Sequence, residues 1–344
     1  MPTDPKTLLA KFQPKVSKPL PVEAQLCSLR ISPEGNTLAG GTFVGTILRW
    51  DNSTPTPTVT TPIQGHNGWV QCVQFHPDNK RLFSADSWGR LCCWNFADKE
   101  AKPTWEVAQA HDGWIHGLAL HKDGSLLATG GRDRTLRLTS SVDGKQIAKL
   151  DAKEDVLSVA FHPDGKSLLS GDLKGVIKQW DLEKKSVVRE FDAKVMFLRD
   201  RIQDVGGVRC FTFNADGSWL IAGGSQPKTG GFVQGNNMLL TFDWATGKLL
   251  HTFKSATDND GYILDLHWNK AGFVMAAASG QSGQGKVLFH QPEDAQPFYA
   301  GAIPNVHALA VHPNGKRLIV SATNANSAGN GRPTAIGAFH GHHY

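Results

Sequence analysis

The sequence predicts an all-β fold, a seven-bladed β-propeller of four-stranded antiparallel blades, closed by pairing of an N-terminal strand with the C-terminal blade. The first observation is a motif that occurs seven times, as RISPEGNTLAGG, QFHPDNKRLFSA, ALHKDGSLLATG, AFHPDGKSLLSG, TFNADGSWLIAG, HWNKAGFVMAAA and AVHPNGKRLIVS. One position of this motif falls at Pro33, Pro77, Lys122, Pro163, Ala215, Lys270 and Pro313. The spacing is about 40 to 55 residues, and a β-type repeat of this length is typical of propeller blades.

The second observation is the pattern within each repeat. A polar turn, as in residues 162–165, leads from one apolar strand to the next, and a single blade built in this way cannot bury both of its faces. We therefore expect bulky residues between blades, at Phe75, Leu120, Phe161, Phe213 and Trp268. Three residues earlier the side chains are nearly all small, as expected where blades converge near the axis: Ser28, Cys72, Gly117, Ser158, Cys210, Asp265 and Ala308.

Two segments that end in Trp-Asp carry a family resemblance. The segments GTILRWD (residues 45–51) and GVIKQWD (residues 175–181), together with the Gly65-His66 pair, resemble the WD-repeat β-propeller family. The resemblance covers residues 24–340, and it implies a hydrogen-bonded set of His, Ser or Thr, Asp and Trp in each well-conforming blade.

This chain is expected to be a diverged member of that family, because no blade has the full set. Blade 2 combines His66, Ser84 and Trp94 with Trp88 at the Asp position; blade 3 combines His111, Thr129 and Asp133 with Thr139 at the Trp position; blade 4 combines Trp180 with Lys174 in the turn. We therefore expect apolar packing to contribute more to stability than buried polar networks do.

The two ends of the chain are expected to complete one blade. Blade 7 has a predicted third strand at residues 335–339 but no fourth, and residues 11–20 precede the first inner strand. This segment suits a sheet edge, because Pro14 and Pro19 lack N–H groups and Lys15 and Lys18 discourage further pairing. A disordered basic arm is the alternative. The predicted boundaries are an N-terminal arm at 1–10, one propeller at 11–340 and a tail at 341–344.

Composition limits the class of protein. The 344 residues are 40% hydrophobic and 19% charged, with a formal charge of +5 spread along the chain, which argues against a nucleic-acid partner. No apolar run reaches membrane-spanning length and the N-terminus has no signal-peptide pattern, so we expect no membrane association and a cytoplasmic location. Five cysteines, an odd number, favour free thiols and a reducing compartment.

The predicted functional surface is the top face, which we define as the face where the loops into the inner strands and the turns between second and third strands emerge. It is expected to carry Phe43, Trp69, Trp88, Arg90, Trp114, Arg132, Arg134, Lys174 and Tyr262. Aromatic residues and Arg dominate interface energetics, which predicts a protein or peptide partner and a monomeric propeller within a larger complex. The alternative is that each aromatic residue only caps its blade.

Four long segments crowd the same face. They are residues 194–207, 225–237, 279–285 and 323–333, rich in Gly, Asn, Ser or Gln apart from the first. We interpret them as a wall beside the binding surface, although surface loops also tolerate neutral growth.

The sequence contains no nucleophile elbow, phosphate-binding loop or paired-acid motif, so we do not expect an enzyme. The inner ring offers one acid, Asp265, with His116, His267 and His307 in register, whereas a hard cation needs several converging oxygen ligands. The histidines of the FHGHHY terminus fit a frayed tail better than a metal site. We therefore predict a non-catalytic interaction scaffold with no metal and no cofactor. The alternative is a small-ligand-binding or metal-dependent hydrolase or lactonase-type propeller that uses the central channel.

Overall fold

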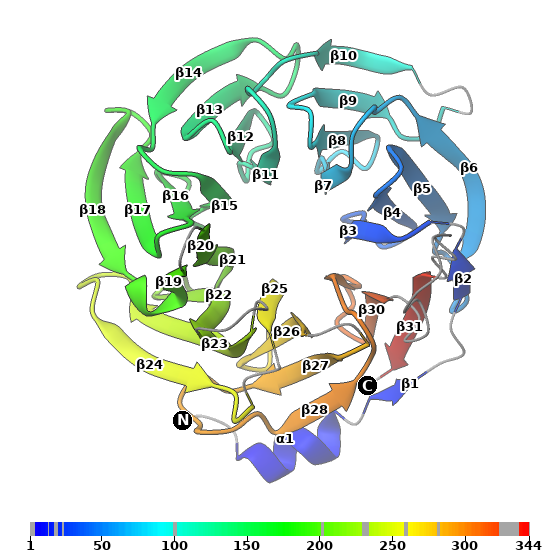
Figure 1. The fold of residues 1–344 in the computed structure, drawn as a ribbon. Coiled ribbons are helices and arrows are strands. Elements are labelled where there is room, and N and C mark those ends of the chain that lie inside the picture. Colours follow the sequence, from blue (N-terminus) through cyan, green and yellow to red (C-terminus); the bar gives the residue numbers. More distant parts are fainter. Residues whose placement is uncertain are drawn as a thin grey trace.

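Six four-stranded antiparallel sheets surround a central opening in the computed structural model (Figure 1). The structure describes residues 4–12, 14–16, 20–22, 24–98, 102–200, 203–228, 234–257, 261–280, 283–322 and 337–343. We number these sheets blades 1 to 6 in chain order, and in each of them the first strand is innermost and the fourth lies at the rim. This confirms an all-β propeller of four-stranded antiparallel blades.

The strands of the first three blades have the following bounds. Blade 1 contains β3 (Leu26–Ile31), β4 (Thr37–Thr42), β5 (Thr46–Asp51) and β6 (Thr58–Gln64). Blade 2 contains β7 (Val70–Phe75), β8 (Arg81–Asp86), β9 (Leu91–Asn95) and β10 (Pro103–Val107). Blade 3 contains β11 (Ile115–Leu120), β12 (Leu126–Gly131), β13 (Thr135–Ser140) and β14 (Gln146–Asp151).

The next three blades follow the same order. Blade 4 contains β15 (Val156–Phe161), β16 (Ser167–Asp172), β17 (Val176–Asp181) and β18 (Ser186–Asp192). Blade 5 contains β21 (Val208–Phe213), β22 (Trp219–Lys228), β23 (Gln234–Asp243) and β24 (Leu249–Lys254). Blade 6 contains β25 (Tyr262–Asn269), β26 (Phe273–Ser279), β27 (Gly285–His290) and β28 (Tyr299–Ala302).

A further sheet, which we call the terminal sheet, joins the two ends of the chain. It contains β29 (Ala308–Val311), β30 (Arg317–Ala322) and β31 (Gly337–His343), and the free edge of β31 pairs with β1 (Lys15–Val16) and β2 (Leu20–Val22). The register sets Leu20 opposite Phe339 and Lys15 opposite His343. Pairing between the N-terminal segment and the last strand is therefore present. The described part of β31 continues past residue 340, where we placed the end of the propeller, and residues 335–336 of the predicted strand lie outside the described residues.

The predicted N-terminal arm contains a short helix, α1 (Pro5–Lys11). The Asp4 carboxylate caps this helix by accepting a hydrogen bond from the Thr7 N–H at 3.2 Å, and Pro5 occupies the first turn, where no donor is needed. Leu8 and Phe12 are buried among core residues of blade 6 and the terminal sheet, and the Phe12 and Phe273 rings lie 5.0 Å apart. The helix thus adds apolar contacts to the closure of the ring.

Small inner-strand side chains join neighbouring blades. The Ser28 hydroxyl donates to the Val70 carbonyl of the next blade at 3.3 Å, and the Ser158 hydroxyl donates to the Val208 carbonyl at 2.8 Å. The Cys72 thiol reaches the His116 carbonyl at 3.3 Å. The predicted ring of small residues therefore lies where blades meet.

The repeated turn between the first and second strands makes a second set of inter-blade contacts. Its histidine donates a side-chain N–H to a glycine carbonyl in the corresponding turn of the next blade, in His76 to Gly124 (3.1 Å), His121 to Gly165 (2.9 Å) and His162 to Gly217 (3.0 Å). In each of these turns the other ring nitrogen accepts a backbone N–H, at 3.1 to 3.5 Å. The repeated motif therefore forms the turn within its own blade and also supplies a hydrogen bond to the neighbouring blade.

Only part of the predicted inter-blade core is fully buried. Phe75 is buried against Phe96, with ring centres 4.9 Å apart, whereas the other bulky inner-strand positions are half-buried, at Leu120, Phe161, Phe213 and Trp268. The fully buried side chains lie mainly on second and third strands, because these strands have a neighbour on both edges and on both faces.

Two predicted loop extensions contain paired strands. Residues 194–207 include the short helix η1 (Lys194–Met196) and the hairpin β19 (Phe197–Asp200) and β20 (Gln203–Gly206). Within residues 225–237, the ladder between β22 and β23 continues from Ser225 opposite Asn237 to Lys228 opposite Gln234. The corresponding segment of blade 6 separates β26 from β27, and the segment at 323–333 lies outside the described residues.

Deletion of residues 1–22 is expected to lower the melting temperature by on the order of 10 °C and to reduce solubility. It removes the strands paired with β31 and the burial of Leu8 and Phe12, which together stabilise the fold by roughly 3 to 6 kcal/mol. The exposed edge of β31 would also invite pairing with other chains. Differential scanning calorimetry, with deletion of residues 1–3 as control, measures the effect. A truncated protein that melts like the full-length chain would show that the segment is dispensable.

Candidate functional site

A β-bulge near the start of each inner strand shapes the central channel. In blade 5, Val208 pairs with Gly224 and Cys210 with Gly223, so Arg209 is an extra residue in the ladder. The same shift occurs in the inner strands of the other five numbered blades. A bulge redirects a side chain relative to simple alternation. The residues at these bulges are Cys27, Gln71, His116, Leu157, Arg209 and Leu264.

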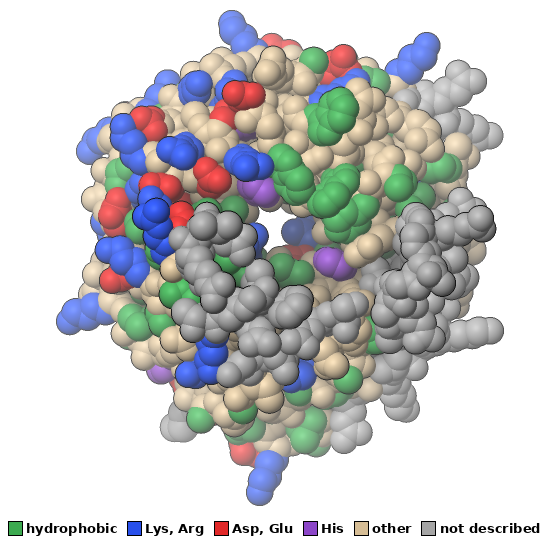
Figure 2. Space-filling model, viewed as in Figure 1, with side chains coloured by type: hydrophobic (Ala, Val, Ile, Leu, Met, Phe, Trp, Pro, Cys, Tyr) green, Lys and Arg blue, Asp and Glu red, His purple; other side chains and the backbone are tan. Residues whose placement is uncertain are grey.

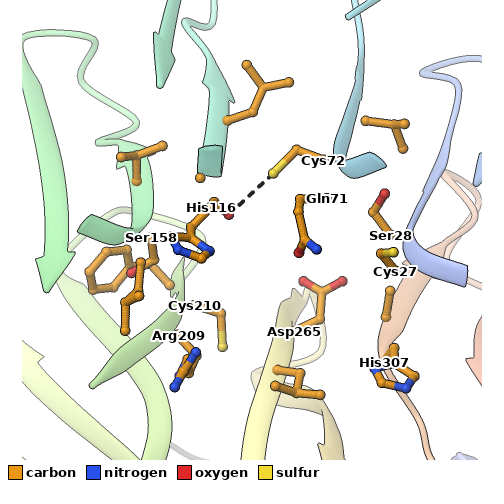
Figure 3. A pocket seen from close by; sticks show the side chains of 18 of the residues that line it. Cys27, Ser28, Gln71, Cys72, His116, Ser158, Arg209, Cys210, Asp265 and His307 are labelled. Carbon is orange, nitrogen blue, oxygen red and sulfur yellow. Dashed lines mark hydrogen bonds between the residues drawn. The ribbon is translucent and has the colours of Figure 1, made fainter. Parts of the chain in front are cut away.

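The bulge residues line the upper part of the channel. Together with Phe43 and His307 they surround a cavity of about 180 Å³. Figure 3 shows His116 and Arg209 on one side of the channel and His307 on the other. Strict alternation along each strand cannot identify this ring, and only a repeat-wide comparison of the residue preceding each small position could have pointed to it.

The one acid of the predicted inner ring is already engaged. Asp265 accepts from Arg30 Nη1 at 2.8 Å, from the Leu309 N–H at 3.1 Å and, through its other oxygen, from the Leu266 N–H at 3.0 Å. These contacts link blade 6 to the terminal sheet and to blade 1, so the carboxylate acts as a structural clip.

The channel thiols and imidazoles are held neutral by burial. Burial raises the pKa of Cys72 to about 12 and raises that of Cys210, so neither is a thiolate nucleophile at neutral pH. Burial also lowers the pKa of His307 to about 4, and burial together with the charges of Arg209 and Arg132 lowers that of His116 to about 4. At neutral pH, Arg209 is therefore the one charged member of the upper ring.

Three predicted aromatic residues form a continuous row beside the channel. The ring of Trp69 lies 4.7 Å from that of Phe43 and 5.0 Å from that of Trp114, in both cases edge to face. The row ends at His307, 6.0 Å from Phe43, and at His116, 5.5 Å from Trp114. Figure 2 shows hydrophobic side chains gathered beside the central opening, and Trp69 is 41% exposed.

Two predicted residues lie outside this row. Trp88, in the turn between β8 and β9, is 66% exposed and rests against the backbone of Gly68. The Arg90 guanidinium contacts the Gly65 carbonyl and the Glu106 carboxylate on the outer strand β10. The Arg90 guanidinium is thus engaged by groups outside the channel, one of them on the outer strand of its blade.

The predicted cations of blades 3 and 4 differ in their pairing. Arg134 lies 3.6 Å from Asp155, and Lys174 donates to Glu154 at 2.6 Å. Arg132 is exposed and has no ion pair with a described residue. The top face therefore presents mixed charge over these blades, as Figure 2 also shows.

Tyr262, the remaining predicted residue, contacts a bulge residue. The guanidinium carbon of Arg209 lies 5.0 Å from the centre of the Tyr262 ring, a favourable cation–π arrangement. Tyr262 therefore holds Arg209 in the channel.

One sequence expectation about the scaffold was wrong. Blade 2 contains a full polar set, because Asp86, two residues before Trp88, accepts from His66 at 2.7 Å, while the Ser84 hydroxyl lies 2.6 Å from His66 and 2.7 Å from the Trp94 N–H. Burial opposes ionisation of Asp86, but hydrogen bonds from His66 and a backbone N–H hold its pKa below its ordinary value. The turn therefore places the Asp86 carboxylate beside the His66 imidazole, although Asp86 lies two residues before the position at which the family has its Asp.

Blade 3 makes a partial set. The His111 imidazole bonds Asp133 and Thr129, both at 2.8 Å, and Thr139 replaces the Trp. Blade 4 retains only the bond from the Trp180 N–H to the Ser170 hydroxyl, at 2.9 Å.

No group of three or more His, Cys, Asp or Glu side chains that could hold a metal occurs within the described part of the chain. The terminal histidines at 340, 342 and 343 have side chains that lie outside this description. Within the described residues no helix has the length and apolarity needed to cross a membrane.

Comparison with known proteins identifies the repeat type. A family model described as "WD domain, G-beta repeat" matches residues 57–95, 103–140 and 144–181. The "Small ribosomal subunit protein RACK1y" of Oryza sativa subsp. japonica is 33% identical over 162 residues, which are 46% of this chain and 46% of that protein. The "Small ribosomal subunit protein RACK1z" of Arabidopsis thaliana is 30% identical over 175 residues, 48% of this chain and 53% of that protein. The chain spans about half the length of the curated relatives it matches.

Substitution of Asp265 by Asn is expected to lower the free energy of unfolding by about 1 to 3 kcal/mol, because it weakens a charged hydrogen bond to Arg30. Glu183→Gln, which makes the same change of charge in an exposed turn, serves as control. Urea denaturation monitored by tryptophan fluorescence measures both variants. A hydrolytic activity in the wild-type protein that disappears in Asp265→Asn would contradict a purely structural role.

Proposed function

We propose that this chain, a WD-repeat β-propeller, is a non-catalytic scaffold that binds a protein or peptide partner on its top face. We further infer that the terminal sheet is the seventh blade, with residues 11–340 and the remainder of β31 acting as one propeller domain. The support for this count is that β29 lies next to both β25 and β3. Its Leu309 belongs to a buried cluster with residues of blade 6, and its Ala308 belongs to one with residues of blade 1.

The row of Phe43, Trp69 and Trp114 is the observation that carries the proposal. A blade cap needs contact only with its own blade, whereas these rings touch one another across three blades. Large aromatic side chains in such a row supply much apolar area at low entropic cost to a binding surface.

Two observations favour this function over the enzyme alternative. The Asp265 carboxylate has three hydrogen-bond donors within the protein, and burial keeps the Cys72 and Cys210 thiols protonated. A metal-dependent hydrolase in this channel would need free oxygen ligands, and a thiol enzyme would need a thiolate.

The relatives suggest the cellular setting of the proposed scaffold. They are named as proteins of the small ribosomal subunit, which supports a cytoplasmic location and membership of a larger complex. We propose that the propeller enters such a complex as a monomer and that its contacts are with protein, without a membrane, nucleic acid or cofactor at the top face.

Replacement of Trp69 and Trp114 together by Ala is expected to weaken partner binding by about 2 to 4 kcal/mol while the melting temperature changes little. The partner is obtained by affinity purification of the tagged chain from its source cells, with stoichiometry determined by quantitative mass spectrometry. Calorimetric titration of the purified partner then gives the affinity of each variant.

The matched control is Leu249→Ala with Leu250→Ala, which also removes two exposed large apolar side chains, but from the outer strand β24. The proposal requires that this control binds as the wild type does. Unchanged affinity in the folded double-tryptophan variant would remove the proposed surface, and a co-purifying metal or small molecule without a stoichiometric protein would favour the alternative function.

A further inference from the structure

Two arginines reach the channel, and only one of them has a carboxylate partner. Arg30 is paired with Asp265 at 2.8 Å. Arg209 makes no ion pair with any described residue, and its Nε atom is buried without a hydrogen-bond partner. Burial lowers the pKa of the Arg209 guanidinium, which reflects the cost of holding this charge away from water. An anion supplied from outside would remove that cost.

The position of Arg209 is fixed in the absence of any anion. The bulge between Val208 and Cys210 directs the residue into the upper channel, and the Tyr262 ring stacks on the guanidinium at 5.0 Å. A side chain held in this way loses little rotamer freedom when it binds a ligand, so binding energy is not spent on ordering it.

His116 lies within electrostatic reach of two cations. Burial and the charges of Arg209 and Arg132 together lower its pKa to about 4, so the imidazole is neutral and offers an N–H donor at neutral pH. Neither arginine has a carboxylate partner among the described residues, and Arg132 is exposed on the top face. The cavity beside His116 thus combines the uncompensated positive charge of Arg209 with a hydrogen-bond donor.

The aromatic row continues directly from this space. Trp114 contacts His116 at a ring distance of 5.5 Å, and Trp69 and Phe43 follow. A ligand that enters the channel mouth beside His116 must therefore pass next to the exposed ring of Trp69 and the half-buried rings of Phe43 and Trp114. Free inorganic anions would leave these rings unused, whereas a peptide with adjacent acidic and apolar side chains would cover both features.

We propose that the upper channel beside His116 binds the carboxylate of an Asp or Glu side chain from a partner peptide, through Arg209. An apolar side chain of the same peptide packs on the row of Phe43, Trp69 and Trp114. This inference rests on the proposed top-face function and adds the chemistry of the partner.

The test uses random 12-residue peptides displayed on phage, selected on the full-length protein and counter-selected on the Trp69→Ala, Trp114→Ala variant. The recovered peptides are expected to share an acidic residue at a fixed spacing from an aromatic or aliphatic residue. Calorimetry with the synthetic consensus peptide should show at least a tenfold loss of affinity for Arg209→Gln. The control Lys145→Gln makes the same charge change at an exposed turn between β13 and β14 and should bind as the wild type does.

The same titrations include a peptide in which the acidic residue is replaced by its amide. This amide peptide should bind the wild-type protein at least tenfold more weakly than the acidic peptide does. Its affinity should fall little further when Arg209→Gln replaces the wild-type protein, because the two changes remove the same interaction. The comparison of the acidic and amide peptides on the wild-type protein shows whether the carboxylate contributes to binding, even if Arg209→Gln folds poorly.

Three results would overturn the inference. They are recovered peptides without a shared acidic residue, equal affinity of the acidic and amide peptides, and equal affinity of the folded Arg209→Gln variant. If binding still requires Trp69 and Trp114 in these cases, the proposed docking function stands without the carboxylate site. If no recovered peptide depends on the two tryptophans, both proposals fail.

Discussion

The contacts that join each blade to the next are the constraint on which the rest of this structure depends. A four-stranded sheet cannot cover its own faces, so every blade must be packed and hydrogen-bonded to two neighbours. Ser28 and Ser158 make these bonds near the axis, and the turn histidines His76 and His162 make them where the repeated turns meet. The last junctions bring together residues far apart in sequence, which is why Asp265 reaches Arg30 and β31 pairs with β1 and β2.

The side chains that packing between blades does not require, and that can therefore serve binding, include those at the starts of the inner strands. A bulge at this point adds one residue to each ladder of blades 1 to 6 and directs it into the channel. Blade stability requires a small residue next to the bulge but does not dictate the bulge residue itself. That freedom accommodates an arginine in blade 5 and a histidine in blade 3. Trp69 and Trp114 directly precede the inner strands β7 and β11, and their rings lie beside the channel opening.

The sequence predicts the repeat, the blade type, the small inner ring and the contact between the chain ends, because each follows from periodicity or from an unfilled strand position. It also predicts that Phe43, Trp69 and Trp114 lie on one face, since they precede strands or occupy turns, and the structure places their rings in contact. Arg209 escapes prediction because a one-residue bulge alters the simple alternation on which side-chain facing is inferred. Asp86 is missed because a turn can supply a carboxylate from a neighbouring position, and helix α1 is too short and too weakly patterned to stand out.

Hydrogen–deuterium exchange on the complex with the purified native partner tests the central claim, that the rim above the channel is the docking surface. Peptides covering residues 43–46, 66–71, 112–116 and 132–134 should exchange more slowly in the complex than in the free protein. The turns at residues 76–80 and 162–166 and the outer strands β18 and β24 should exchange equally in both. Slower exchange confined to those turns or outer strands, with the rim unchanged, would contradict the account.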